Sequence, residues 1–163
     1  MSSVTEHTKV NTLALVAHDN CKLKMIDWVS RHRLPLQNKR LVTTGTTGRM
    51  IEDRLGKGLD ILRVKSGPLG GDQQIGAKIA EGSIDALIFF WDPLEPMSHD
   101  PDIKALLRVA TLWNIPIACN ESSADFLVSS PLFKGYERVV PDFDAHNARQ
   151  ISTGIPVDEK KCS

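Results

Sequence analysis

Short apolar runs alternate with helical patterns along almost the whole of this 163-residue chain. Continuous apolar runs are typical of strands that are covered on both faces, and their alternation with helices predicts a parallel sheet between two helical layers. We therefore expect an α/β fold: a single three-layer domain with a mainly parallel, five-stranded sheet of the Rossmann/flavodoxin type. The predicted strands are Thr12–Ala17, Arg40–Thr43, Ile61–Val64, Asp85–Trp91 and Ile115–Cys119.

Apolar residues in the intervals between these strands recur at helical spacing. Pro35 and Asn38 indicate a turn, and Val139–Val140 indicates one more short strand at an edge of the sheet. The predicted helices are Cys21–His32, Arg49–Leu55, Asp72–Glu81, a segment that starts at Asp100–Pro101, and Ser122–Val128.

The length of the chain suits one domain with a substantial core. We expect that domain to cover residues 11–150, with flexible tails at residues 1–10 and 151–163. Lys plus Arg and Asp plus Glu each number 20, so the formal net charge is zero. A balanced charge argues against a general nucleic-acid binder, but it is compatible with a small anionic ligand.

No segment of the sequence suggests a membrane or an export route. The segment Met1–Asn11 lacks the apolar core of a signal peptide, and the run Ala86–Trp91 is too short to cross a bilayer. Cys21, Cys119 and Cys162 show neither a Cys-x-x-Cys pair nor metal-ligand spacing. This sparse set fits reduced thiols, so we expect a cytoplasmic protein in which Cys21 and Cys119 serve packing.

Polar or glycine-rich segments follow four of the predicted strands at their C-terminal ends. These segments are His18–Asp19, Thr44–Gly48, Ser66–Asp72 and Asp92–His99. Ligands of open parallel sheets bind beyond the carboxyl ends of the strands. The sequence therefore predicts a binding site along this edge of the sheet.

Two of these segments have the groups that a phosphate needs. Thr44–Gly48 offers hydroxyls, small residues and a following helix N-terminus. Ser66, Gly67 and Lys22 can add a hydroxyl, a backbone donor and a cation. No Gly-Lys-Ser/Thr follows, so this is not a Walker loop. An ordinary threonine-capped turn explains Thr44–Gly48 equally well, and Lys22 taken alone suggests a solvated surface lysine.

The glycine-rich stretch Ser66–Gln74 lies between a predicted strand and a predicted helix. Glycine permits positive φ and a close approach of the backbone to a ligand. A helix that starts near Asp72 points its free N–H groups back toward this stretch, where an anion can bind. Considered alone, Asp72 is more simply explained as a helix cap.

Acidic and imidazole groups lie in or near the same segments. Crowded carboxylates raise one another's pKa above about 3.9, and an aspartate with a raised pKa can act as a base near neutral pH. Neutral histidines can donate to a carbonyl or enolate oxygen. For Asp102 alone, stabilisation of a helix dipole is the simpler explanation. The candidates are Asp19, Asp72, Asp92, Asp102, His18 and His99.

Neither a metal-ligand spacing nor a Gly-x-Ser-x-Gly elbow accompanies these groups. The residues therefore predict a pocket for a small phosphate ester with acid–base groups beside it, and no metal or other cofactor.

The combined motifs closely resemble those of the methylglyoxal synthase family, over about residues 12–145. The matching segments are Ala14–Asp19 with Cys21–Lys22, Thr44–Gly48, Ser66–Gln74, Phe89–Leu94 and His99–Asp102. The family converts dihydroxyacetone phosphate to methylglyoxal and inorganic phosphate without a cofactor. It is typically a homohexamer, and inorganic phosphate is a common allosteric inhibitor.

The resemblance implies a role for each matching residue. Asp72 would be the base that removes a proton from the hydroxymethyl carbon, and His99, supported by Asp102, would donate to a substrate oxygen. Arg149 is the nearest match to an arginine that reaches the phosphate site of a neighbouring subunit. The residues that would line the site or hold the phosphate are His18, Asp19, Lys22, Thr44, Gly45, Thr46, Thr47, Ser66, Gly67 and Asp92.

Two other classes of protein are alternatives. The same fold occurs as an allosteric domain of carbamoyl-phosphate synthetase, which binds effectors without chemistry. Such a domain need not keep Asp72, His99 and Asp102 together, and all three are present here. A nucleotide-binding signalling domain would need an adenine or ribose signature, which the sequence lacks. We therefore expect the enzyme.

Overall fold

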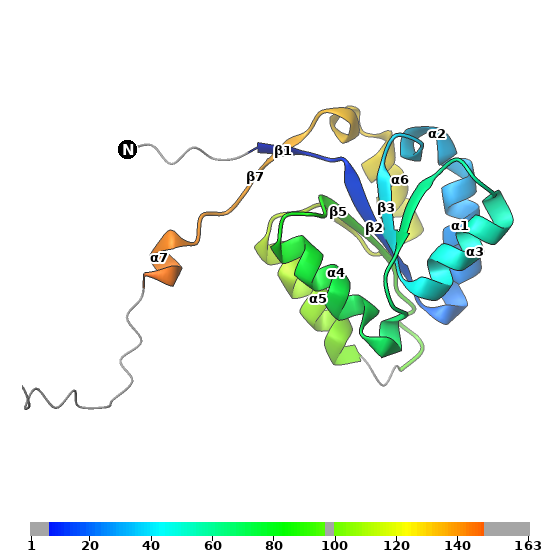
Figure 1. Ribbon diagram of the computed structural model, residues 1–163, viewed down its shortest axis with the longest axis horizontal. Coiled ribbons are helices and arrows are strands. Elements are labelled where there is room, and N and C mark those ends of the chain that lie inside the picture. Colours follow the sequence, from blue (N-terminus) through cyan, green and yellow to red (C-terminus); the bar gives the residue numbers. More distant parts are fainter. Residues whose placement is uncertain (1–6, 97–99, 149–163) are drawn as a thin grey trace, which may run out of the picture.

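A five-stranded, wholly parallel sheet forms the centre of the protein (Figure 1). The computed structural model describes residues 7–96 and 100–148. The strands lie in the order β4-β3-β2-β5-β6, and the predicted three-layer α/β fold is confirmed. Their bounds are β2 Thr12–Ala17, β3 Arg40–Thr43, β4 Asp60–Arg63, β5 Ala86–Phe90 and β6 Ile117–Ala118.

Helices cover both faces of this sheet. Leu13, Leu15 and Ala17 of β2 pack on one face with α1 (Lys22–Arg31), α3 (Gly45–Leu55) and α6 (Glu121–Ser129). Ala14 and Val16 pack on the other with α4 (Gly71–Ala80) and α5 (Asp100–Leu112). Figure 1 shows these two helical layers on either side of the strands. Because both faces of β2 are buried, its sequence is apolar throughout instead of alternating.

The order of the strands creates a crevice beside the central strand. The chain proceeds from β2 through β3 to β4 at one edge, and then returns to add β5 and β6 on the other side of β2. At such a reversal the following helices lie on opposite faces, which leaves room for a ligand beyond the carboxyl ends of the strands. The predicted site lies at this point of the fold.

The start of α3 differs from the prediction. This helix begins at Gly45, with Thr44 as its N-cap, and not near Arg49. Packing overrides the low helix propensity of glycine here. A Cβ at Gly48 would lie only 2.0 Å from Thr43 Oγ1, and one at Gly45 would lie 3.2 Å from the Val64 carbonyl oxygen. The Thr44–Gly48 segment is therefore the first turn of a helix packed tightly on β3 and β4.

The turn predicted at Pro35 contains the short helix α2 (Arg33–Leu36). Pro35 is tolerated there because the first N–H groups of a helix have no partner within the helix. The bounds predicted for β2 and β3 are confirmed, and, apart from the start of α3, the ends of the remaining predicted elements lie within one or two residues of the predicted positions. Three short 3-10 helices complete the described chain: η1 Asp19–Cys21, η2 Gly67–Leu69 and η3 Pro131–Lys134.

A second, two-stranded sheet lies beside the main body. Strand β1 (His7–Lys9) pairs antiparallel with β7 (Glu137–Val139), so residues 7–9 do not belong to a tail, and Val139 does not extend the main sheet. Buried Arg138 connects this ribbon to the body through a 2.9 Å bond from Nη1 to the Trp113 carbonyl, just beyond α5. Helix α7 (Asp144–Asn147) follows and lies away from the sheet (Figure 1).

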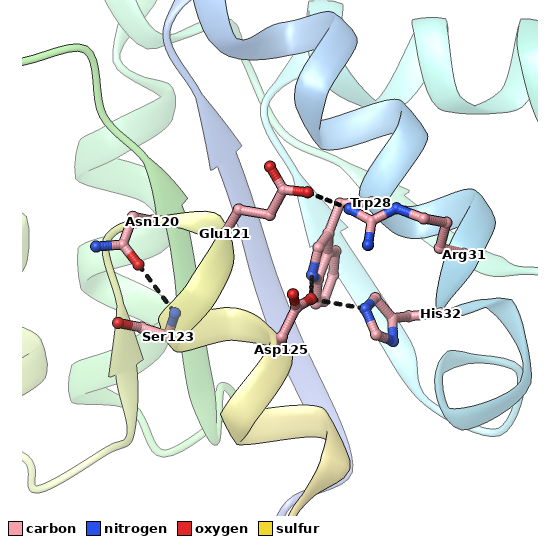
Figure 2. A network of polar contacts seen from close by, with 7 residues as sticks. All are labelled: Trp28, Arg31, His32, Asn120, Glu121, Ser123 and Asp125. Atoms are coloured by element: carbon pink, nitrogen blue, oxygen red, sulfur yellow. Dashed lines mark hydrogen bonds and ion pairs between the residues drawn. The ribbon is translucent and has the colours of Figure 1, made fainter.

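A polar network connects α1 to α6 within one helical layer (Figure 2). Asp125 Oδ1 accepts from Trp28 Nε1 at 2.9 Å and lies 2.8 Å from His32 Nε2. Arg31 also pairs with Glu121. Burial opposes ionisation of Asp125, but the bonds from His32 and Trp28 outweigh it and lower the pKa of this carboxyl. The network holds α1, whose first residue is Lys22, against the body of the domain.

Candidate active site

A cavity of about 220 Å³ lies at the carboxyl ends of the central strands. The predicted residues that line it come from three different segments of the chain. They are His18, Asp19, Lys22, Thr44, Thr46, Ser66, Gly67 and Asp72. Four further described residues also line the cavity, and no role was predicted for them: Val16, Ala17, Pro68 and Phe89. Strand residues such as Val16 and Phe89 are hard to find from sequence because their pattern is that of ordinary core.

The Thr44–Gly48 segment supplies one wall through the N-terminus of α3. Thr44 Oγ1 bonds to Thr47 Oγ1 at 3.2 Å, and no side chain caps this helix. The first backbone N–H groups of α3 therefore face the carboxyl edge without a side-chain cap, where an anion would be stabilised. Gly45 and Thr47 are not among the cavity-lining residues, so they support this wall from behind.

A tight turn brings a second helix N-terminus, that of α4, to the cavity. Gly70 has a φ of +96°, and a Cβ at Gly71 would lie 2.0 Å from the Lys65 carbonyl oxygen, so both positions require glycine. The N–H groups of Leu69 and Gly71 both bond to the Ser66 carbonyl at 3.0 Å. The turn folds the start of α4 back onto Ser66 and Gly67.

Asp72 lies in the first turn of α4 and is only 4% exposed. The N-cap of this helix is Gly70, so Asp72 is not its N-cap residue. A buried carboxylate is costly unless its surroundings stabilise the charge, and a helix N-terminus does so in part. The carboxylate is therefore held inside the cavity, beside the Ser66–Gly67 wall.

His18 follows β2 and is 6% exposed. Its Nδ1 accepts a hydrogen bond from the Asp92 N–H at 3.1 Å, and its ring packs edge-on against Phe89 with centroids 5.2 Å apart. Because Nδ1 accepts, the neutral ring carries its proton on Nε2. His18 therefore presents an N–H donor at Nε2.

Lys22 begins α1 and forms an ion pair with Asp19. The side chain of Lys22 is 16% exposed, whereas that of Asp19 is 82% exposed. Lys22 is thus not the solvated surface lysine that it suggested when taken alone. It brings a positive charge to the cavity wall, and Asp19 partly balances that charge from the rim.

Asp92 lies outside the cavity-lining set, although its backbone touches His18. Its carboxylate accepts from Asn20 Nδ2 and from the Leu94 N–H, both at 3.0 Å. The bond from Asn20, followed by the one from Leu94, lowers the pKa of the Asp92 carboxyl. The expectation that crowding raises the pKa is therefore wrong for Asp92, because donors stabilise its charge. Sequence reasoning did not find Asn20, whose contacts lie more than 70 residues away.

Among the described residues, Asp102 is a further predicted residue that does not line the cavity. Asp102 is half-buried in the first turn of α5. His99 and Arg149 lie outside the described residues, so their roles stay predictions. Burial raises the pKa of the Cys21 and Cys119 thiols, which fits packing better than nucleophilic chemistry.

Residues 7–96 and 100–148 contain neither a metal-binding cluster nor a membrane-spanning helix. Among these residues, no three His, Cys, Asp or Glu side chains are grouped so that they could hold a metal ion. Within the same ranges, no helix combines the length and apolar character that a membrane span requires.

Known proteins are similar to this chain in sequence and in fold. The MGS-like domain family matches residues 24–119. Methylglyoxal synthase from Hahella chejuensis is 56% identical over 142 residues, which are 87% of this chain and 92% of that protein. Methylglyoxal synthase from Pseudoalteromonas atlantica is 60% identical over 134 residues, which are 81% of this chain and 98% of that protein.

A solved structure extends the similarity to three dimensions. The crystal structure of methylglyoxal synthase from Elizabethkingia anophelis NUHP1 superposes with a TM-score of 0.83 at 46% identity, over 90% of this chain and 97% of that one. The sequence similarity therefore spans the sheet, both helical layers and the cavity. The chain belongs to the methylglyoxal synthase family.

Proposed function

We propose that this protein converts dihydroxyacetone phosphate to methylglyoxal and inorganic phosphate, as a carbon–oxygen lyase acting on phosphates. One observation carries the proposal: the buried Asp72 carboxylate shares a cavity with the anion-binding groups of Thr44 and Ser66–Gly67. A domain that only bound a phosphate ester would gain nothing from a buried carboxylate beside the phosphate, because the two negative charges repel.

The phosphate of the substrate is held between the two helix N-termini. Thr44, Thr46 and Ser66 offer hydroxyl groups, Gly67 offers its backbone N–H, and Lys22 supplies the positive charge. These groups suit a phosphate because they combine donors with a favourable dipole. With the phosphate fixed there, the carbon chain extends toward Asp72.

Asp72 then removes a proton from the hydroxymethyl carbon, and the product is an enediolate. Negative charge develops on the substrate oxygens, where the Nε2–H of His18 is suited to donate. We assign the same type of donation to His99, with Asp102 in support, on the basis of the family resemblance. A general base typically contributes about 10²–10⁴ in rate.

The enediolate next expels phosphate by β-elimination. The electron pair of the enediolate forms a new carbon–carbon double bond as the C–O bond to phosphate breaks, and the remaining enol tautomerises to methylglyoxal. Elimination requires this C–O bond to stand out of the enediolate plane. A rigid grip on the phosphate by Thr44, Ser66 and Gly67 sets that angle.

The test is incubation of the purified protein with dihydroxyacetone phosphate while methylglyoxal and phosphate are measured together. We expect equal yields of the two products, and no effect of a metal chelator. Phosphate without methylglyoxal would indicate a phosphatase and would overturn the proposal.

A further inference from the structure

The side chain of Asn20 joins η1 to the segment that follows β5. Its Nδ2 lies 3.0 Å from Asp92 Oδ2 and 2.7 Å from Glu95 Oε2. An amide nitrogen carries two hydrogens, so one group can serve both carboxylates. Asn20 thereby holds two negative charges together that would otherwise repel one another.

Asp92 transmits this connection to the cavity. Its Oδ1 accepts from the Leu94 N–H at 3.0 Å, which closes a turn, while its own N–H donates to His18 Nδ1 at 3.1 Å. Asn20 thus reaches His18 through a single intervening residue. The position of the Asp92 N–H decides which nitrogen of His18 carries the proton.

Loss of the Asn20 amide would remove one donor from each carboxylate. Repulsion between Asp92 and Glu95 would then push their turn apart, and the Asp92 N–H would no longer be fixed against His18. A released Nδ1 can take up a proton, which gives either the wrong tautomer or an imidazolium. The charged groups that share the cavity with His18 are Asp19, Lys22 and Asp72.

We propose that Asn20 is a positioning residue for the reaction proposed above, and that it holds the Asp92–Glu95 turn so that His18 stays in the Nε2–H tautomer. The inference rests on the proposed function only for its kinetic part. The tautomer of His18 is a property of the protein alone and is measured without substrate.

An alternative explanation is that Asn20 is an ordinary surface amide. Exposed hydrogen bonds contribute little to stability. The two explanations therefore differ in a clear way. A surface amide affects neither His18 nor turnover, whereas a positioning residue affects both with little change in stability.

The experiment compares Asn20→Ala and Asn20→Asp with the wild type, and uses Asn38→Asp as the matched control. Asn38 is exposed and precedes β3, at the opposite end of the strands from the cavity. Nitrogen-15 NMR of the histidine rings reports which nitrogen of His18 is protonated, and steady-state kinetics separate kcat from KM.

We expect His18 Nδ1 to change from an acceptor to a protonated nitrogen in Asn20→Asp, with kcat about 10-fold lower and KM changed less than about 3-fold. The change should be smaller in Asn20→Ala, which adds no third carboxylate, and absent in Asn38→Asp. A reduction in kcat without a change at His18, or an unchanged kcat, would overturn the proposal. If the wild type made no methylglyoxal, the proposed function would fail, and the NMR comparison would still test the tautomer.

Discussion

Asp72 and Gly67 lie side by side in the cavity: a Cβ at Gly67 would be 3.4 Å from Asp72 Oδ2. Gly67 begins η2, and Asp72 lies in the first turn of α4, so the Gly70–Gly71 turn between them folds the chain back on itself. The proposed base is thus next to the proposed phosphate wall. A ligand whose phosphate contacts Ser66 and Gly67 places its carbon chain within reach of Asp72.

The first prediction concerns Asp72→Asn. The amide keeps the shape of the side chain but cannot accept a proton as a base, so turnover should drop at least ~10²-fold. Stability should change little, because the amide keeps the size and shape of the side chain and Asp72 is not the N-cap residue of α4. Product formation and thermal unfolding are measured on the same preparation. Turnover near that of the wild type would remove Asp72 from the role of base.

Gly48→Ala provides a second prediction, because the added Cβ would lie 2.0 Å from Thr43 Oγ1 and 2.7 Å from Arg63 Cγ. The start of α3 must then move away from the sheet. We expect a stability loss of about 1–3 kcal/mol, typical of overpacking, and a higher KM because Thr44 moves with the helix. Denaturant unfolding and steady-state kinetics measure the two effects.

Gly76→Ala is the matched control for this substitution. Gly76 also lies inside a helix, but the nearest neighbour of its Cβ would be Leu106 Cδ1 at an ordinary 3.9 Å. Alanine favours a helix over glycine by about 1 kcal/mol, so this variant should be as stable as the wild type or more so. Equal changes in stability for the two substitutions would show that the close packing around Gly48 does not contribute to stability.

The parts of the fold that depend on local pattern could be predicted from the sequence. Continuous apolar runs identify the strands, because a strand buried on both faces must be apolar throughout. The position of the cavity follows from the same reasoning, since polar segments at the carboxyl ends of parallel strands meet at one edge. The predicted lining residues from His18 to Asp72 accordingly lie together.

Features that depend on contacts between distant residues could not be predicted. β1 pairs with β7, which lies far from it in the sequence: His7, for example, is opposite Val139. The residues around His7 contain no pattern that distinguishes it from a tail residue. Asp85 was predicted to belong to a strand, yet its side chain accepts from the N–H groups of Asn11 and Thr12 at 3.0 Å. The early start of α3 likewise depends on packing that overrides propensity.

A third prediction concerns Arg149, which lies outside the described residues. We propose a hexamer in which this arginine reaches the phosphate site of a neighbouring subunit, because guanidinium binds phosphate in a bidentate manner and stays charged. The wild type should show sigmoidal substrate dependence in the presence of phosphate, and Arg149→Ala should flatten the curve.

Light scattering provides the control for this experiment. The hexamer should persist in Arg149→Ala, so that lost cooperativity is not simply dissociation. Unchanged curvature together with unchanged phosphate inhibition would mean that Arg149 is a solvated arginine near the end of the chain.

The fourth prediction concerns the network between α1 and α6 and its dependence on pH. The pKa of Asp125 is lower in the folded protein than in the unfolded chain, because the bonds from His32 and Trp28 outweigh burial. A carboxylate with a depressed pKa stabilises the fold above its unfolded pKa of about 4, and this contribution disappears as the pH falls below that value. Asp125→Asn should therefore reduce stability near neutral pH, and the difference from the wild type should shrink at lower pH.

The size of this effect is limited because the Asp125 side chain is 42% exposed. Solvent screening restricts the loss at neutral pH to about 1 kcal/mol. Urea unfolding of both proteins at a series of pH values between about 3 and 7 measures the difference. Asp27→Asn is the control, because Asp27 lies exposed on α1 and takes no part in the network drawn in Figure 2. The difference in stability between Asp125→Asn and the wild type could instead stay constant across this pH range. Lost packing, and not lost charge, would then explain it. In that case the carboxylate would have no electrostatic role in holding α1 against α6.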